Sequence, residues 1–492
     1  MIDLTLKRIT QLLPSALPWC AIHVAGTNGK GSVCAYLSTS LTFAGLLVGR
    51  FTSPHLIDRW DCISINNAPI PHSTFAAAEN TILETNSRLQ LEATEFELLT
   101  ATAFEVFTRA GVQIGIVEVG LGGRQDATNV LRPENVLVSV VTRIELDHQA
   151  FLGDTLAAIA GEKAGIAKRR VPMVVDGNNS GDVVEVVRSV VAKAGGGAVI
   201  VATPEKLGDV GTGCEITTPA FGRLRFLRML PGAFQPHNLA CAVNALSTIA
   251  PRFSQLTGKG IVAAVADTKW PGRLEHLEFT ANEKVLVDGA HNPQAQRELR
   301  KYVDGHVRAG RKVWWVLAVT KGKDVAGMVE ELVARGDAVV ATRFGKVDGM
   351  PWVTPVETSE IAGCVMQEKA EVEDCVEAVQ LACRKAKEEN AAVVVAGSLC
   401  VVSDRSGGVV LIRIADIWWG TCIGICETGK PSTRPPYRSI KTAEVEIYIS
   451  GRLCEITVFP DQIHRFPSGR VSRNLLKRLF GSQTSVIGNW PY

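Results

Sequence analysis

The sequence contains no long hydrophobic run. Its apolar segments, such as Ala391–Ala396, are far shorter than the roughly 20 residues that a helix needs to cross a bilayer. The first residues also lack the basic start, apolar block and small-residue cleavage site of a secretory signal. We therefore expect a cytoplasmic protein without membrane partners, and the sequence leaves an additional mitochondrial pool open.

Neither sign of charge is in excess, and no cysteine motif is present. With 52 Lys and Arg against 50 Asp and Glu, the formal net charge is +2, so bulk charge gives no reason to expect a nucleic-acid partner. The 12 cysteines include no CxxC pair and no Cys/His cluster at zinc spacing, which favours reduced thiols over a zinc fold. A hydrophobic share of 46% excludes a wholly disordered chain, and 492 residues suggest two or three domains.

The front of the chain alternates buried-strand patterns with helical ones. Near-continuous apolar strands separated by helices predict an α/β domain with a mostly parallel sheet covered on both faces. Residues 214–230 differ, and predict a hairpin in a smaller antiparallel sheet. The expected strands are Ala21–Ala25, Val48–Thr52, Gln113–Val119, Val136–Thr142, Pro172–Val175 and Ala198–Ala202.

A second α/β series begins near residue 283 and predicts a smaller, Rossmann-like domain. A helix is expected over Glu371–Lys387, on an apolar stripe of helical spacing. We divide the chain into residues 1–279, 280–406 and 407–492, the last a tail without βα rhythm that contains one strand pattern, Ala443–Ile449. The expected strands of the second series are Lys284–Val287, Val313–Val319, Asp337–Thr342 and Ala392–Ala396.

The segment Gly26–Ser32, GTNGKGS, follows a predicted strand and opens a predicted helix. That context suits a phosphate-binding loop, because glycines let backbone amides approach phosphate oxygens, Lys30 reaches them, and the helix N-terminus adds its dipole. The loop is shorter than the common form, and Gly31 separates Lys30 from Ser32. The alternative is a glycine-rich turn without a ligand, which the presence of the strand, the glycine pair, Lys30 and Ser32 disfavours.

Two acidic positions lie where parallel strands end. Glu118 stands in an otherwise apolar strand, where a carboxylate is costly unless a cation or a hydrogen bond satisfies it; a magnesium ligand and a cap on the following Gly-rich turn are both compatible with that position. Asp147 and His148 follow the strand Val136–Thr142, at the edge where ligands of open α/β sheets bind. His148 alone fits a metal ligand or a structural histidine.

Lys163 falls on the apolar face of a helix predicted to begin at Asp154 or Thr155. Such a lysine either extends its ammonium to the surface, which the sequence alone favours, or is desolvated with a lowered pKa. A neutral amine reacts with CO₂ to give a carbamate, which supplies carboxylate-like oxygens to a metal. Further along, Asp288–Pro293 forms a polar turn after a strand, and Arg273 lies near the expected boundary, where an arginine suits a transferring phosphoryl group. An Asx-turn and a surface arginine are the structural alternatives.

Together these blocks resemble the folylpolyglutamate/dihydrofolate synthase branch of the Mur ligase superfamily. The resemblance covers about residues 1–405, with eight blocks in the family's order, and 395–404 resembles the family's last strand. The blocks are HVAGTNGKGS at 23–32, TSPHL at 52–56, EVGLGGR at 118–124, LDH at 146–148, EKAGI at 162–166, GxFQxxN at 232–238, WPGRLE at 270–275 and DGAHNP at 288–293.

The resemblance implies a P-loop domain like the central domain of Mur ligases and a set of site residues. Gly29, Lys30, Gly31 and Ser32 match the ATP-phosphate loop. Ser53, Glu118 and His148 match magnesium ligands, and Lys163 matches a lysine that is carbamylated in relatives and joins that set. Arg273 and Asp288 match ATP contacts, as do Asn238 and His291 near the nucleotide, and the resemblance implies catalytic roles for Lys30, His148, Lys163 and Arg273.

The implied activity is an amide ligation in folate biosynthesis, with ATP and Mg²⁺ as cofactors. A pteroate carboxylate attacks the γ-phosphate of ATP, and L-glutamate then attacks the acyl phosphate. The segment Ser53–Ile65 reads SPHLIDRWDCISI, where folylpolyglutamate synthases usually continue with residues like RERI. It is similar to the fungal dihydrofolate synthetases, so we expect 7,8-dihydropteroate as acceptor.

Two other functions stay open at this point. A folylpolyglutamate synthase performs the same chemistry on tetrahydrofolate, and a non-catalytic nucleotide-binding protein keeps the loop without the chemistry. The protein is expected to act as a monomer on small molecules. The tail 407–492 has no counterpart in the resemblance, and it is interpreted as a disordered segment that arises from a gene-model error rather than as a genuine extension.

Overall fold

Contacts divide the chain into two units, Met1–Thr421 and Cys422–Tyr492. The computed structural model describes residues 6–206, 213–280, 283–351, 353–398, 443–449 and 452–458. In this described part, none of the helices combines the length and the apolar character that crossing a bilayer requires.

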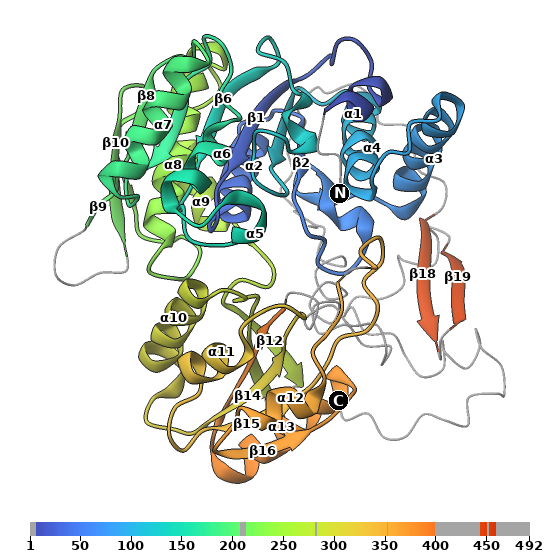
Figure 1. Ribbon diagram of the computed structural model, residues 1–492, viewed down its shortest axis with the longest axis vertical. Helices are drawn as coiled ribbons and strands as arrows, with labels where there is room; N and C mark the ends of the chain where they lie inside the picture. The colour runs from blue at the N-terminus through green and yellow to red at the C-terminus, as the bar shows by residue number, and fades with distance from the viewer. Residues whose placement is uncertain are drawn as a thin grey trace, which may run out of the picture. The chain divides into compact units, whose positions relative to one another are not determined.

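The first sheet of the larger unit has eight strands in the order β4-β3-β2-β5-β1-β6-β7-β8. Figure 1 labels β1, β2, β6 and β8 of this sheet. The strands β2, β5, β1, β6, β7 and β8 run parallel to one another, whereas β3 and β4 form an antiparallel edge beside β2. The bounds are β1 Cys20–Ala25, β2 Val48–Phe51, β3 Ile63–Ile65, β4 Ala68–Pro69, β5 Ile114–Glu118, β6 Val136–Val141, β7 Met173–Asp176 and β8 Val199–Ala202.

Helices cover both faces of this sheet. Ile22 and Val24 of β1 pack in one cluster with α2, α8 and α9, whereas Ala21 and Ala25 pack on the opposite face, against the sides that carry α4 and α6. Side chains alternate along a strand, so a strand between two helical layers is apolar on both faces. The bounds are α1 Lys7–Leu12, α2 Lys30–Phe43, α3 His72–Leu89, α4 Glu95–Arg109, α5 Gln149–Leu152, α6 Leu156–Ala164, α7 Gly181–Lys193, α8 Gln235–Ile249 and α9 Gly258–Asp267, with 3₁₀ turns η1 Arg59–Cys62, η2 Ala127–Val130 and η3 Ala250–Arg252.

A small antiparallel sheet lies beside the first one. Its strands are β9 Glu205–Lys206, β10 Cys214–Thr218 and β11 Gly222–Phe226. The hairpin of β10 and β11 pairs Cys214 with Phe226, and it confirms the hairpin predicted within residues 214–230.

The second large sheet has six strands in the order β12-β13-β17-β14-β15-β16, all parallel except the edge strand β12. Trp315 faces a layer with α10, α11 and α12, and Trp314 faces α13 on the opposite side. The bounds are β12 Glu275–Thr280, β13 Glu283–Asp288, β14 Val313–Ala318, β15 Ala338–Ala341, β16 Glu368–Glu371 and β17 Ala392–Gly397; α10 Pro293–Tyr302, α11 Val325–Leu332, α12 Thr358–Gly363 and α13 Cys375–Glu389; and the π-helical turn η4 Val303–Arg308.

The predicted start of the last helix was wrong. Glu371 ends β16, and α13 begins at Cys375, where the Asp374 side chain accepts the amides of Val376 and Glu377. An aspartate at this position satisfies two free amide donors of the first helical turn, so it fixes the start of the helix more strongly than the apolar stripe does. The division at 279/280 stays a prediction. It falls within β12, a strand that pairs with β13 of the second sheet.

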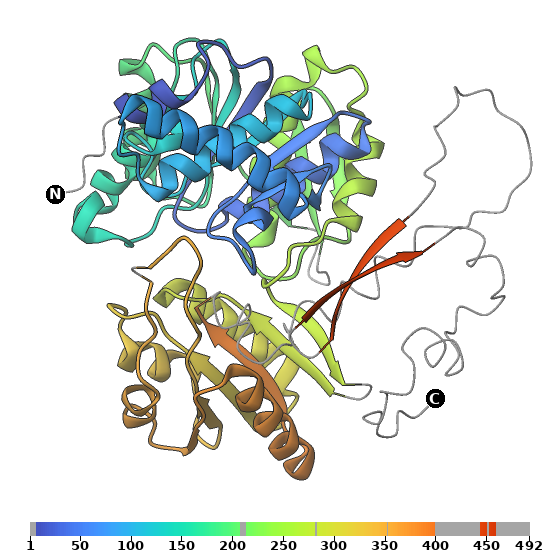
Figure 2. The same cartoon turned by 90° about the vertical axis from the view of Figure 1, so that its right-hand side faces the viewer.

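The smaller unit contains two described strands, β18 Ala443–Ile449 and β19 Arg452–Val458, which pair antiparallel. Figure 2 shows them side by side as a twisted two-stranded ribbon. The strand pattern predicted at Ala443–Ile449 is confirmed. Apart from β18 and β19, the predicted tail 407–492 lies outside the described residues.

Candidate active site

The glycine-rich loop leaves β1 at the carboxyl edge of the first sheet and leads directly into α2. Gly29 adopts φ 92°, a left-handed conformation that favours glycine, and α2 begins at Lys30. A Cβ on Gly29 would also collide with the side-chain amide of Asn238. The loop is held from below, because the amides of Thr27 and Asn28 donate to the Arg143 carbonyl at 2.8 and 3.2 Å.

Lys30 and Ser32 occupy the start of α2, as the sequence predicts. The Lys30 ammonium donates to the Thr27 carbonyl at 3.2 Å, so the side chain folds back over the loop. Ser32 is buried, and its hydroxyl accepts from Gln235 Nε2 at 3.1 Å. Asn238 in turn donates to Gln235 Oε1 at 3.4 Å, which joins the GxFQxxN block to the loop.

Glu118 is buried at the end of β5, with 5% of its surface exposed. Its carboxylate lies 3.8 Å from Lys30 Nζ and accepts the backbone amide of Ser53. Burial raises the pKa of Glu118 above its ordinary value, although Lys30 and Arg273 act in the opposite direction. The carboxylate therefore stands between Ser53 and the loop lysine, where a further cation would stabilise its charge.

His148 adopts φ 52° at the start of α5 and is half-exposed. Partial burial lowers its pKa, and the charges of Lys323, Lys163 and Lys30 act in the same direction against Asp147. A neutral imidazole is the form that ligates metals. The structure thus brings His148 within the electrostatic reach of both lysines of the predicted site.

Lys163 is buried, with 4% of its surface exposed. It lies on α6, whose predicted N-cap is confirmed because Thr155 accepts the Ala158 amide. Its ammonium donates to the Gly26 carbonyl at 2.8 Å, and burial, followed by the charge of Lys30, lowers its pKa to about 7. The interpretation that Lys163 extends to the surface was wrong: the short α6 presses this side chain against the glycine-rich loop.

The second sheet contributes a buried turn after β13. Asp288 accepts the Leu274 amide at 2.8 Å, and burial raises its pKa despite the charge of Arg273. His291 Nδ1 lies 3.0 Å from the Gly289 carbonyl, so Nδ1 donates the hydrogen bond and Nε2 is left as an acceptor. Burial lowers the pKa of His291 to about 4, which keeps the ring neutral at physiological pH.

Three contacts between the two sheets' loops involve residues that the sequence interpretation missed. Asn28 donates to Gln294 Oε1 at 2.7 Å and accepts from Asn292 Nδ2 at 3.0 Å. Lys323 Nζ lies 3.3 Å from Asp147 Oδ1. Asn28 and Asn292 belong to the GTNGKGS and DGAHNP blocks, so the blocks contained them, but no spacing rule pairs positions more than 260 residues apart.

Asp126 is a further missed residue, and it organises the loop after β5. Its carboxylate accepts the amides of Leu121 and Thr128 at 2.9 Å each. The buried His23 of β1 lies 2.9 Å from the Thr128 hydroxyl, so the loop is tied to the centre of the sheet. The Asp126 carboxylate therefore ties the glycine-rich segment after β5, at Leu121, to the turn η2, at Thr128.

The predicted magnesium ligands differ in the donor atoms that they offer. Among the described residues, no three His, Cys, Asp or Glu side chains converge on one point. The predicted set instead combines the Ser53 hydroxyl, the Glu118 carboxylate, the His148 imidazole and Lys163, of which only a carbamylated lysine would add a second carboxylate-like group. Ser53 and Glu118 offer oxygen, the donor that Mg²⁺ prefers, and His148 offers nitrogen. The magnesium set stays a prediction.

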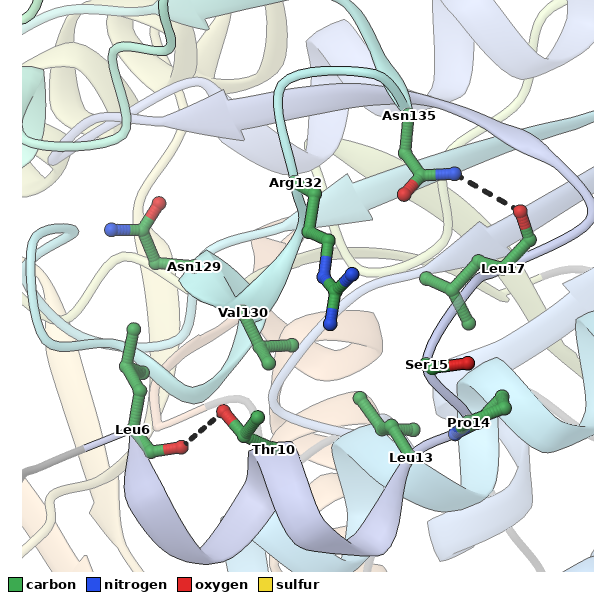
Figure 3. A pocket seen from close by; sticks show the side chains of 10 residues that line it. All are labelled: Leu6, Thr10, Leu13, Pro14, Ser15, Leu17, Asn129, Val130, Arg132 and Asn135. Carbon is green, nitrogen blue, oxygen red and sulfur yellow. Dashed lines mark hydrogen bonds between the residues drawn. The ribbon is translucent and has the colours of Figure 1, made fainter.

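A separate cavity of about 180 Å³ lies between α1 and the loop after η2 (Figure 3). Asn135 immediately precedes β6, and Leu17 lies three residues before β1, so the cavity reaches the amino edge of the sheet. Arg132 extends into the space between Val130 and Leu13 (Figure 3). The predicted site residues lie at the opposite, carboxyl edge.

Known proteins resemble this chain over most of its length. A family model described as the C-terminal domain of dihydrofolate synthetase matches residues 274–405. The probable dihydrofolate synthetase of Schizosaccharomyces pombe is 42% identical over 412 residues, covering 82% of this chain and 97% of that protein. The dihydrofolate synthetase of Saccharomyces cerevisiae is 37% identical and covers 74% and 87%.

Solved structures show the same fold. The Escherichia coli protein FolC in complex with DHPP and ADP matches with a TM-score of 0.70 and 27% identity, over 85% of this chain and 94% of that one. Folylpolyglutamate synthase of Mycobacterium tuberculosis, complexed with ADP and AMPPCP, matches with a TM-score of 0.69 and 30% identity, over 81% and 93%. These likenesses confirm the predicted Mur-ligase-like fold class, and the chain belongs to the folylpolyglutamate/dihydrofolate synthase family.

Proposed function

We propose that this protein is a dihydrofolate synthase, which joins L-glutamate to 7,8-dihydropteroate at the expense of ATP in folate biosynthesis. The observation that carries the proposal is the 42% identity to a probable dihydrofolate synthetase over 97% of that protein's length. The match of residues 274–405 to the C-terminal domain of dihydrofolate synthetase also supports it.

The first step makes an inert carboxylate reactive. A pteroate oxygen attacks the γ-phosphorus of ATP, the bond to the β–γ bridging oxygen breaks, and ADP leaves with that oxygen. The product is an acyl phosphate. We assign the amides of Gly29–Ser32 and the Lys30 ammonium to the phosphates, because the loop stands at the N-terminus of α2 and Lys30 already lies over it.

The second step forms the amide. The glutamate amine attacks the acyl carbon, and a tetrahedral intermediate forms. The nitrogen loses a proton, and phosphate departs with the electrons of the C–O bond and takes up a proton, so amide and hydrogen phosphate are the products. Water would destroy the acyl phosphate, so the site must exclude it. The hydrogen bonds of Asn28 to Asn292 and Gln294 support this role, because they join the phosphate-binding loop to the turn after β13.

Arg273, Asp288, Asn238 and His291 are proposed to hold the nucleotide. Arg273 exerts its charge on both Glu118 and Asp288, which supports a role for its guanidinium beside the phosphates. The neutral His291 offers Nε2 as an acceptor, and Asn238 touches the loop at Gly29. Each group thus has the polarity that a nucleotide base, ribose or phosphate requires.

Ser53, Glu118, His148 and a carbamylated Lys163 are proposed to hold Mg²⁺. When bound there, the ion would neutralise the negative charge shared by ATP and the acceptor carboxylate. Lys163 supports carbamylation, because a pKa near 7 leaves a large fraction of neutral amine at physiological pH. The amine nitrogen then bonds to the carbon of CO₂ and releases one proton.

A folylpolyglutamate synthase activity is the second candidate, because folylpolyglutamate synthase of Lacticaseibacillus casei is 34% identical over 68% of this chain. The deciding experiment gives the purified protein ATP, Mg²⁺ and L-glutamate with either 7,8-dihydropteroate or tetrahydrofolate, and records ADP and product mass. We expect glutamylated product from dihydropteroate and none from a Lys30→Met variant. Product from tetrahydrofolate alone would overturn the proposed acceptor.

A further inference from the structure

Trp270 lies on the backbone of the phosphate-binding loop. A Cβ built on Gly31 would lie 2.8 Å from Trp270 Cζ2 and 3.0 Å from Nε1. Any side chain at position 31 would therefore push the indole away from the first turn of α2. This contact explains why a glycine separates Lys30 from Ser32 in this loop.

Arg50 holds the same indole from the sheet. It lies on β2, and its guanidinium carbon is 4.9 Å from the centre of the Trp270 ring, a cation–π contact. Its neighbour Phe51 packs with α4 on one face of the sheet, so Arg50 points to the other face, towards α2. Burial lowers the pKa of Arg50 to about 10, which still leaves it charged at neutral pH.

The turn that follows Trp270 is tied to the second sheet. The Gly272 amide donates to Glu275 Oε2 at 2.7 Å, and the Gly272 carbonyl accepts from the Gly289 amide at 3.1 Å. The Leu274 amide donates to Asp288 at 2.8 Å. Arg273 is thus carried by a turn that is fixed at its far end by Asp288 and at its near end by Trp270.

We propose that Arg50 is a positioning residue for phosphoryl transfer: it holds the Trp270 indole on the Gly31 backbone and thereby fixes where the turn presents Arg273 to Glu118. The inference rests on the proposed ligase function for its kinetic consequence. It assigns a role to Arg50, which is not one of the predicted site residues. A guanidinium suits this role, because its planar face stacks on an indole while its charge stays in place.

A double-mutant cycle tests the proposal. Arg50→Met, Trp270→Leu and the double variant are compared with the wild type by kcat and KM for ATP and acceptor. We expect Arg50→Met to lower kcat about tenfold or more, since a small misplacement of a charge-stabilising group has large effects, while KM for the acceptor stays close to its wild-type value. In the Trp270→Leu background, Arg50→Met should cause no further loss.

Hydrogen exchange supplies a readout that does not depend on activity. We expect Arg50→Met to accelerate exchange at the amides of Gly272 and Leu274, and Arg50→Lys to restore part of the protection, because an ammonium also binds an indole face. Arg188→Met, at an exposed arginine of α7, is the matched control and should change neither exchange nor kcat. If Arg50→Met does not fold, Arg50→Lys is measured in its place.

Two outcomes would overturn the role of Arg50. Equal losses of kcat in both backgrounds would mean that Arg50 acts without Trp270, and unchanged exchange at Gly272 and Leu274 would mean that it does not hold the turn. A wild-type protein that forms no product contradicts the ligase function instead, and the exchange measurement then still decides whether Arg50 fixes the turn.

Discussion

Lys163 shows how much a single side chain depends on its surroundings. The sequence places it on an apolar helical face, and both a surface lysine and a desolvated one satisfy that pattern. The structure decides for the buried position, because the ammonium meets the Gly26 carbonyl of a loop that lies 137 residues earlier in the chain. A residue's chemistry in this site is therefore set by partners that the local sequence does not contain.

Replacing Lys163 tests the proposed carbamate. We expect Lys163→Ala to lose nearly all turnover, with partial recovery on adding a small carboxylic acid such as acetate, which returns a carboxylate to the vacated space. Turnover is measured as ADP and amide product together. Lys193→Ala, at an exposed lysine ending α7, is the control. Wild-type activity of Lys163→Ala would contradict the carbamate.

The same lysine gives the carbamate a pH dependence. Only the neutral amine reacts with CO₂, and a pKa of about 7 means that the neutral form is lost as pH falls below that value. Native mass spectrometry after incubation with bicarbonate should therefore show the added CO₂ above pH 7 and its decline below it. A mass gain that persists unchanged at pH 5.5 would contradict this assignment.

At the scale of elements, Asp337 fastens β14 and β15 to the π-helical turn η4. Its buried carboxylate accepts Trp315 Nε1 at 3.0 Å and the amides of Val313 and Ala334, and it pairs with Arg308. Burial raises the pKa of Asp337, but the hydrogen bonds from Arg308 and Trp315 outweigh it and hold the pKa below its ordinary value. The charged form is therefore the one that stabilises the second sheet.

This lowered pKa predicts how stability changes with acid. A carboxyl whose pKa is depressed on folding contributes stability above its unfolded pKa, near 3.9, and loses it as pH falls through the folded pKa. We expect Asp337→Asn to lower the unfolding free energy at pH 7 by about 2–4 kcal/mol and to weaken its decline below pH 4. Urea unfolding followed by tryptophan fluorescence measures both, and Asp304→Asn, at a more exposed partner of Arg308, is the control.

A wild-type and an Asp337→Asn protein with parallel pH profiles would contradict the assignment. The comparison isolates the Asp337 carboxyl, because the wild-type and Asp337→Asn proteins share every other titrating group. An effect as small as that of Asp304→Asn would mean that the pairing with Arg308 adds little to the sheet.

The strands were predictable because a strand that is buried on both faces consists of a nearly continuous run of apolar residues. Val136–Val141 and Val313–Ala318 lie within one residue of their predicted ends, since an apolar run bounded by turns has few other structures. The start of α13 was not predictable, because Glu371 lies in the preceding strand β16, and the exposed residues of that strand resemble the start of a helix. The Arg50–Trp270 contact was beyond local patterns altogether, because it joins an arginine in a strand to a linker residue far along the chain.

The predicted site residues illustrate the same division. Gly29–Ser32, Glu118 and His148 could be placed at one sheet edge, because parallel strands end together. The pKa shifts of Glu118 and His148 could not be predicted, since the charges of Lys30, Arg273 and Lys323 act on them from separate segments of the chain. The roles of these residues stay predictions that the experiments above decide.

On the scale of the whole molecule, part of the chain lies outside its match to a dihydrofolate synthetase. The protein of Schizosaccharomyces pombe is matched over 97% of its length by 82% of this chain. We therefore expect truncation after Asp404 to leave kcat and KM unchanged. The truncated and full-length proteins are compared by product formation and by thermal unfolding, and an insoluble or inactive truncated protein would show that residues 405–492 belong to the functional fold.

The bridges between Asn28, Asn292 and Gln294 have a consequence for the salt response of this enzyme. They are made by neutral amides, so dissolved ions have no charge to screen there, whereas the neighbouring Lys323–Asp147 pair weakens as the screening length shrinks. At high salt concentration the ion pair between Lys323 and Asp147 is weakened, whereas the hydrogen bonds between the amides remain. The glycine-rich loop and the turn after β13 therefore stay joined through their amide contacts when the salt concentration changes.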